Sequence, residues 1–171
     1  STASGVLTAD ITVNNNVLDA NGRLNGSNFT SWTPIGYFKG NNDQVSFKGT
    51  FDGQGHTVSG LYFYDKSTSY VGLFGMISVG TVIKNVKLTD SYIEGKWYVG
   101  GICGYSARSS TIYGCSASGK IKGEYHVGGI CGGAMMNVTI YGCSNAAIIN
   151  GTKSAGGICG NTETGSTVYA C

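Results

Sequence analysis

Short apolar runs separated by glycine and polar residues recur along the second half of the chain at a fixed interval. The run Val-Gly-Gly-Ile-Cys-Gly stands at residues 99–104 and again at 127–132, and an altered copy occupies residues 155–160. The three copies therefore begin 28 residues apart. A fixed period of about 20 to 50 residues is typical of solenoids, in which each repeat buries its apolar face against its neighbours.

Each repeat contains three short segments whose residues favour strands, at 98–103, 111–117 and 120–122 in the first complete copy. Ile, Val, Thr and Tyr are common in strands, and the glycines and serines between the segments are common in tight corners. We therefore predict an all-β fold, a parallel β-helix (β-solenoid) with about 28 residues per turn. Stacked turns would lie about 4.8 Å apart and place equivalent residues in columns.

The chain is expected to form one domain over residues 1–171. Residues 1–36 do not follow the period, and we interpret them as an N-terminal cap over the open end of the core, with Trp32 as a plug. Residues 37–70 are predicted to form irregular first turns, and residues 71–171 to form four glycine-motif repeats.

All six cysteines belong to the last three repeats, in pairs twelve residues apart: Cys103 with Cys115, Cys131 with Cys143, and Cys159 with Cys171. Stacking of the turns would place the cysteines in two columns, each with one cysteine from each of these three turns. Pairing along a column would leave one orphan in each, so we favour disulfides within each turn, although distance permits vertical pairing. A core of free thiols is the further alternative. An even cysteine count fits an oxidising compartment, hence an extracellular location.

Charge and hydropathy argue against several partners. Charged residues make up 12% of the chain, the net charge is +2, and no basic run is present, so we expect no nucleic acid partner. No apolar stretch approaches the roughly 18 residues of a membrane helix, so we expect no membrane insertion. A signal peptide is also lacking, which suggests a segment of a larger, multidomain chain.

The carboxylates do not form an evident catalytic cluster. Asp52 precedes two glycines and suits a turn, and His56 has no nucleophile near it in sequence. Stacking predicts two surface ion pairs, each worth about 0.2–1 kcal/mol: Glu94 with Lys122, and Lys96 with Glu124. The cysteine spacing is not that of a metal or redox motif. We therefore expect no enzyme activity, no metal and no cofactor.

Aromatic residues form two predicted columns that would face outward if the flanking Val and Ile face the core. Either column could stack sugar rings, or could be a ladder that only stabilises the sheet. We prefer the ladder and keep both columns as candidate ligand-binding residues. Their members are Tyr113, Tyr141 and Tyr169, and Tyr70, Tyr98 and His126.

The combination of motifs resembles a known family. Trp-x-Pro-Ile-Gly at residues 32–36, Phe-Asp-Gly-Gln-Gly-His-Thr-Val-Ser-Gly-Leu at 51–61 and the later glycine runs resemble the GLUG-motif segments of large bacterial cell-surface proteins. The resemblance implies a right-handed parallel β-helix in an extracellular, adhesin-like setting. It leads us to expect a non-catalytic structural or adhesive module whose partner is a host-surface protein or glycan. A carbohydrate-binding module and a β-helical polysaccharide lyase or hydrolase are the alternatives.

Overall fold

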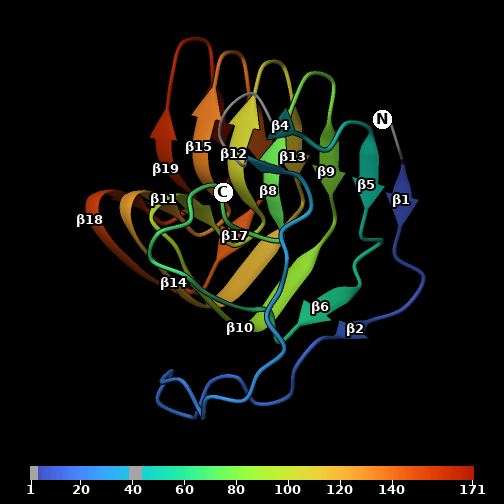
Figure 1. Cartoon of the computed structure of the whole chain (residues 1–171). Helices are drawn as coiled ribbons and strands as arrows, with labels where there is room; N and C mark the ends of the chain where they lie inside the picture. The colour runs from blue at the N-terminus through green and yellow to red at the C-terminus, as the bar shows by residue number, and fades with distance from the viewer. Residues whose placement is uncertain (1–3, 39–43) are drawn as a thin grey trace.

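The computed structural model describes residues 4–38 and 44–171, which form short strands and no helix. Nearly all strands pair in parallel with the equivalent strand of the next turn. Figure 1 shows the turns in sequence order, from the blue N-terminal strands at one end to the red C-terminal strands at the other. The predicted all-β solenoid of stacked turns is confirmed, and its last turns repeat at the predicted interval.

Three parallel sheets run along the stack. The first, in spatial order, contains β1 (Gly5–Val6), β5 (Thr50–Asp52), β9 (Val82–Lys84), β13 (Thr111–Tyr113), β16 (Thr139–Tyr141) and β20 (Thr167–Tyr169). The second contains β8 (Phe74–Ile77), β12 (Cys103–Ala107), β15 (Cys131–Met135) and β19 (Cys159–Thr162).

The third sheet contains the longest strands, which turn the corners of the solenoid. Its main path is β2 (Ile11–Thr12), β6 (Thr57–Ser59), β10 (Lys87–Glu94), β14 (Ser116–Gly128) and β11 (Trp97–Gly100). Three more strands pair with it: β7 (Tyr62–Tyr64), β17 (Ser144–Asn145) and β18 (Ile148–Gly156). A separate antiparallel pair joins β3 (Tyr37–Phe38) to β4 (Gln44–Val45).

The core is a set of apolar columns enclosed by the three sheets. One column runs through the first sheet, where Phe51, Ile83, Ile112, Ile140 and Val168 lie opposite one another. Phe51 and Ile83 are further apart along the chain than Ile112 and Ile140. The first turns are therefore longer than the later ones, although their strands keep the same register.

The glycine motif allows successive turns to approach closely. A Cβ atom on Gly132 would lie 2.6 Å from backbone atoms of Tyr98 and Val99 in the preceding turn. Real Cβ contacts are not this short, so only glycine fits. The repeat spacing of the motif therefore follows from the repeated contact between turns.

The N-terminal segment adds strands to the stack. β1 pairs with β5 and β2 with β6, in both cases as the outermost strand of the sheet's main path. The long connection after β2 is fixed by Asp90, whose carboxylate accepts hydrogen bonds from the N–H groups of Val17 and Leu18, both at 2.9 Å. Trp32 packs against the core, and its indole N–H donates to the Leu73 carbonyl. These contacts cover one edge of the sheets.

Candidate functional site

An aromatic depression lies at one corner of the solenoid. It is lined by Trp97, Tyr98, Tyr125 and His126, which we call the aromatic hollow, and has a volume of about 330 Å³. Trp97 and Tyr125 are opposite each other on adjacent turns, with ring centroids 5.8 Å apart and planes at 79°. In this edge-to-face arrangement the two rings do not stack face to face, and Trp97 is 43% exposed.

The corner is built from residues in the left-handed backbone region. Tyr70, Tyr98, His126 and Ser154 occupy the same place in successive turns, with φ between 55° and 64°. This region is uncommon for bulky residues and costs about 1 kcal/mol or more at each position. Contacts around the corner must offset this cost, and ring stacking supplies part of them.

The predicted column of Tyr70, Tyr98 and His126 does form. Its ring centroids are 5.3 Å and 4.7 Å apart. Tyr105, which the repeat pattern does not single out, packs edge-on against both tyrosines, and burial raises the pKa of all three tyrosine hydroxyls. All four rings of the cluster are half-buried, and Nδ1 of His126 is buried with no hydrogen-bond partner among the described residues.

The column of Tyr113, Tyr141 and Tyr169 also forms, on the first sheet. Centroid separations are 4.9 Å and 5.4 Å, and the ring planes lie within 8° of parallel. Rings stacked in this way cover one another's faces, so the column suits a stabilising ladder better than a sugar platform. The aromatic hollow differs from this column because its rings line a depression.

Two lysines border the aromatic hollow. Lys96 Nζ lies 5.1 Å from the Trp97 ring centroid, and Lys153 Nζ lies 5.1 Å from that of Tyr125. Both distances suit cation–π attraction. The predicted ion pair between Lys96 and Glu124 is absent from the salt bridges of the described residues, and Lys96 is placed over Trp97 instead.

A polar groove lies beside the hollow along β14, which carries Glu124 in the groove and Tyr125 in the hollow. The groove has a volume of about 470 Å³. It is lined by three glycines at equivalent positions of successive turns, Gly95, Gly123 and Gly151, and by polar side chains. The polar side chains are Lys66, Glu94, Lys122, Glu124, Asn150 and Thr152.

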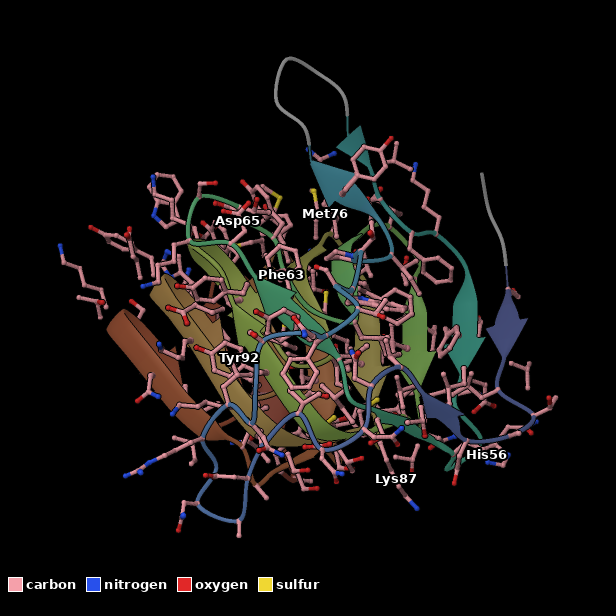
Figure 2. All side chains as sticks on the ribbon, turned by 60° about the horizontal axis from the view of Figure 1, so that its bottom comes forward. His56, Phe63, Asp65, Met76, Lys87 and Tyr92 are labelled. Carbon is pink, nitrogen blue, oxygen red and sulfur yellow. The ribbon has the colours of Figure 1, made fainter. Side chains whose placement is uncertain are left out.

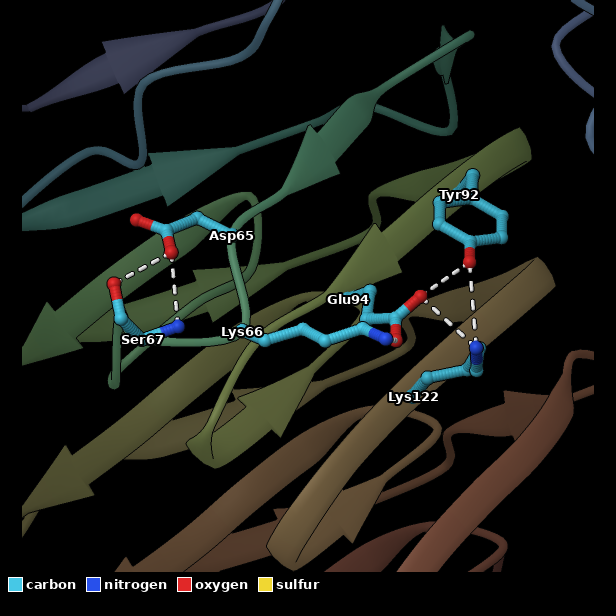
Figure 3. A network of polar contacts seen from close by, with 6 residues as sticks. All are labelled: Asp65, Lys66, Ser67, Tyr92, Glu94 and Lys122. Atoms are coloured by element: carbon cyan, nitrogen blue, oxygen red, sulfur yellow. Dashed lines mark hydrogen bonds and ion pairs between the residues drawn. The ribbon is translucent and has the colours of Figure 1, made fainter.

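Glu94 is the centre of the groove's polar network (Figure 3). Its carboxylate accepts a hydrogen bond from the Tyr92 hydroxyl, lies 2.9 Å from Lys122 Nζ and lies 3.5 Å from Lys66 Nζ. The predicted contact with Lys122 is confirmed, but its description as a surface pair is wrong, because Glu94 is only 6% exposed. Lys66 was missed because it belongs to a connection outside the repeat period.

Opposing effects set the pKa of Glu94. Burial alone raises this pKa. The hydrogen bonds from Tyr92 and Lys122 and the positive charges of Lys122 and Lys66 together lower it by more than burial raises it, so the net pKa lies below the ordinary 4.5. Burial, with the hydrogen bond to Glu94, raises the pKa of Tyr92, which stays protonated as a donor. The network therefore holds an ionised carboxylate in a largely covered position.

We expect Glu94→Gln to lower the free energy of unfolding at pH 7 by about 2 kcal/mol, because it removes hydrogen bonds to a charged acceptor. A depressed folded-state pKa stabilises the fold above the unfolded value and loses this effect as pH falls through the folded value. The stability advantage of the wild type should thus shrink below about pH 4. Urea unfolding of both proteins from pH 7 to 3 measures it, and a constant difference would contradict the assignment.

The remaining candidate groups have structural partners. Asp52 accepts a hydrogen bond from the Gln54 N–H at 2.9 Å, as a turn carboxylate does, and His56 lies 3.2 Å from Asp10. Figure 2 shows His56 and Asp65 at opposite ends of the molecule in this view, so these two side chains do not share a site. Across residues 4–38 and 44–171, no three His, Cys, Asp or Glu side chains are grouped to hold a metal ion.

The six cysteines are free thiols in this structure. Four are buried in the core, Cys159 is half-buried and Cys171 is exposed. The register places Cys103, Cys131 and Cys159 opposite one another on adjacent strands. Disulfides within each turn stay a prediction, since no cysteine pair is bonded here.

Comparison with known proteins identifies one motif and two relatives. Residues 95–122 match the GLUG motif family, which confirms the resemblance found in the sequence. Halomucin of Haloquadratum walsbyi is 38% identical over 64 residues, which is 37% of this chain and 1% of halomucin. A protein of Evansella cellulosilytica named a putative Gly-rich membrane protein is 32% identical over 62 residues, 36% of this chain and 7% of that protein.

The aligned part of the chain thus spans only a small fraction of each relative's length. No solved structure was found to match the chain. In the described residues, no helix is long and apolar enough to cross a membrane. The motif, the solenoid and the names of the relatives together fit a structural module of a surface protein.

Proposed function

We propose that this chain is a non-catalytic structural and adhesive module of a large extracellular, cell-surface protein of a bacterium. The observation that carries the proposal is the register of the core column, which holds residue for residue from Phe51 to Val168. A stack without breaks is stiff along its axis, because each turn is bonded to both neighbours by parallel ladders. Such a module extends a surface protein and presents its corners to a partner.

The relatives support this setting. One is named halomucin and the other a Gly-rich membrane protein, and neither name describes an enzyme. Disulfides within each turn are part of the proposal and would stiffen the stack in an oxidising environment. The expected partner is a host-surface protein or glycan.

Glycan binding is the second candidate function, and the aromatic hollow favours it. Sugar rings have apolar faces that pack on exposed aromatic rings, and their hydroxyls bond to charged and amide groups. The hollow supplies Trp97 and Tyr125, and the groove beside it supplies Glu94, Lys122 and Asn150. A glycan lying along β14 would contact both. The stacked column of Tyr113, Tyr141 and Tyr169 is the alternative platform.

We expect the purified chain to bind members of a glycan array saturably, and Trp97→Ala with Tyr125→Ala to weaken binding at least about fivefold, since each ring contributes about 0.5–1.5 kcal/mol. Tyr169→Ala is the matched variant, because it removes an exposed ring of the other column. Loss of binding only in Tyr169→Ala would move the site to that column.

The array also separates the module from an enzyme. Incubation of the same glycans with the chain should yield no shortened products by mass spectrometry. Depolymerisation would contradict the non-catalytic proposal. No glycan binding at all would leave adhesion to proteins, measured by attachment of chain-coated beads to protein-coated and bare surfaces, and equal attachment to both would contradict the adhesive role.

A further inference from the structure

The cysteines contact one another along the solenoid axis. Cys103 lies opposite Cys131, and Cys131 opposite Cys159, as directly paired positions of adjacent parallel strands. In the other column, the N–H of Cys143 donates to Sγ of Cys171 at 3.4 Å. Adjacent strands stack about 4.8 Å apart, which is within the Cα separation that disulfides tolerate.

The thiols also interact between turns. The S–H of Cys131 donates to the Gly133 carbonyl at 3.3 Å, and the neighbouring thiol of Cys103, together with burial, raises the pKa of Cys131. In the other column, the neighbouring thiols of Cys115 and Cys171 lower the pKa of Cys143. These effects of one thiol on another all act between a cysteine and its equivalent in the adjacent turn.

In each cysteine column, the cysteine of the last turn is more exposed to solvent than the others. Cys103 and Cys115 are at most 1% exposed, whereas Cys159 is half-buried and Cys171 is exposed. A dissolved oxidant reaches a thiol only where the sulfur is accessible. In this chain, oxidation should therefore begin at the exposed Cys171 and reach Cys159 later, because the contact with Cys131 and burial raise the pKa of Cys159.

We propose that oxidation joins cysteines of neighbouring turns, as Cys131–Cys159 and Cys143–Cys171, and leaves Cys103 and Cys115 as buried free thiols. The pairing differs from the disulfides within turns that column parity favours. It changes the disulfide stapling of the proposed function from bonds within turns to two bonds between the last two cysteine-bearing turns. The pairing rests on the proposed function only in one respect, the oxidising environment of an extracellular protein, and an experiment can supply this environment directly.

The chemistry requires a disulfide oxidant, such as oxidised glutathione. The Cys171 thiolate attacks one sulfur of the oxidant, breaking its S–S bond, and one glutathione thiol leaves. Cys143 then loses its proton and attacks the Cys171 sulfur, which releases the second glutathione thiol. Two protein thiols are oxidised and one glutathione disulfide is reduced. The Cys131–Cys159 bond forms by the same two steps, with Cys159 attacking a second glutathione disulfide and Cys131 displacing its second thiol. The hydrogen bond from the Cys115 thiol lowers the pKa of Cys143, which favours this second step.

Tryptic mapping distinguishes the two pairings. Cleavage after Lys122 and Lys153 places Cys131 and Cys143 in one peptide, 123–153, and the two later cysteines in another, 154–171. The reduced full chain is equilibrated with oxidised glutathione, unfolded in acidic denaturant to stop thiol exchange, alkylated at its remaining thiols while unfolded, and digested without reductant. We expect 123–153 and 154–171 to be recovered covalently joined, with Cys103 and Cys115 alkylated.

Two variants assign the bonds. Cys143→Ser should leave only Cys131–Cys159 between the peptides, identified by a further cut after Glu163, whereas Cys115→Ser should leave both bonds in place. Recovery of 123–153 and 154–171 as separate peptides, each with an internal disulfide, would overturn the proposal in favour of pairing within turns. Six alkylated cysteines would overturn it as well. Glycan or protein binding by the reduced chain is measured separately, so failure of the pairing does not imply failure of the proposed function.

Discussion

Replacing Ile140 by alanine is expected to lower the free energy of unfolding by about 4 kcal/mol. Ile140 is fully buried in the core column, with Ile112 opposite it on one side and Val168 on the other. Truncation removes apolar contacts and leaves a cavity that the flanking turns cannot fill without losing their own pairing. Urea unfolding followed by tryptophan fluorescence and circular dichroism measures the loss.

Val168→Ala is the matched control for this prediction. Val168 occupies the same column one turn later, but it is 39% exposed. Its truncation should cost less than about 1 kcal/mol, because little apolar surface leaves water there. Equal losses in the two variants would mean that the stack does not bury the column as described.

We expect Gly129→Ala to destabilise the chain by about 3 kcal/mol, which is the range of an overpacked core position. A Cβ at this position would lie 2.2 Å from the carbonyl oxygen of Gly157 in the next turn and 2.2 Å from the Asn145 side chain. The side chain can move, but the carbonyl belongs to the ladder between turns, so relief requires the turns to separate. The thermal midpoint and the urea midpoint should both fall.

The same motif position in the last turn provides the control. At Gly157, no atom lies within 4 Å of the place that an added Cβ would take, and the φ angle is not in the left-handed region. Gly157→Ala should change the free energy of unfolding by less than about 1 kcal/mol and can stabilise the chain slightly by restricting the unfolded state. If both variants lost several kcal/mol in the free energy of unfolding, glycine would be required at this position by the conformation of its own turn. This result would contradict a requirement set by contact with the next turn.

The architecture could be predicted because a repeat period fixes which residues stack. Once the glycine motif sets the repeat interval, Tyr113 must stand beside Tyr141, and Glu94 beside Lys122. The strand segments and the outward position of the tyrosines follow from alternation along each strand. Neither inference needs any knowledge of the irregular first turns.

The site could be predicted only in part. The repeat period shows which residues lie in the same column, but it does not show how buried their side chains are or what else they contact. The burial of Glu94 depends on Tyr92 from its own strand and on Lys66 from a connection outside the repeat. Tyr105 fills the aromatic corner from a different sheet. Contacts between sheets and from non-repeating segments carry no periodic signal, so the sequence pattern cannot reveal them.

Nuclear Overhauser effects between equivalent side chains of adjacent turns test the central claim, the in-register stack, most directly. With Ile and Val methyl groups selectively labelled, the account predicts cross-peaks from Ile112 to Ile140 and from Ile140 to Val168. It predicts none from Ile112 to Val168, which are separated by the turn that contains Ile140. Absence of the first two cross-peaks in the folded protein, or contacts at a shifted spacing, would contradict the stack.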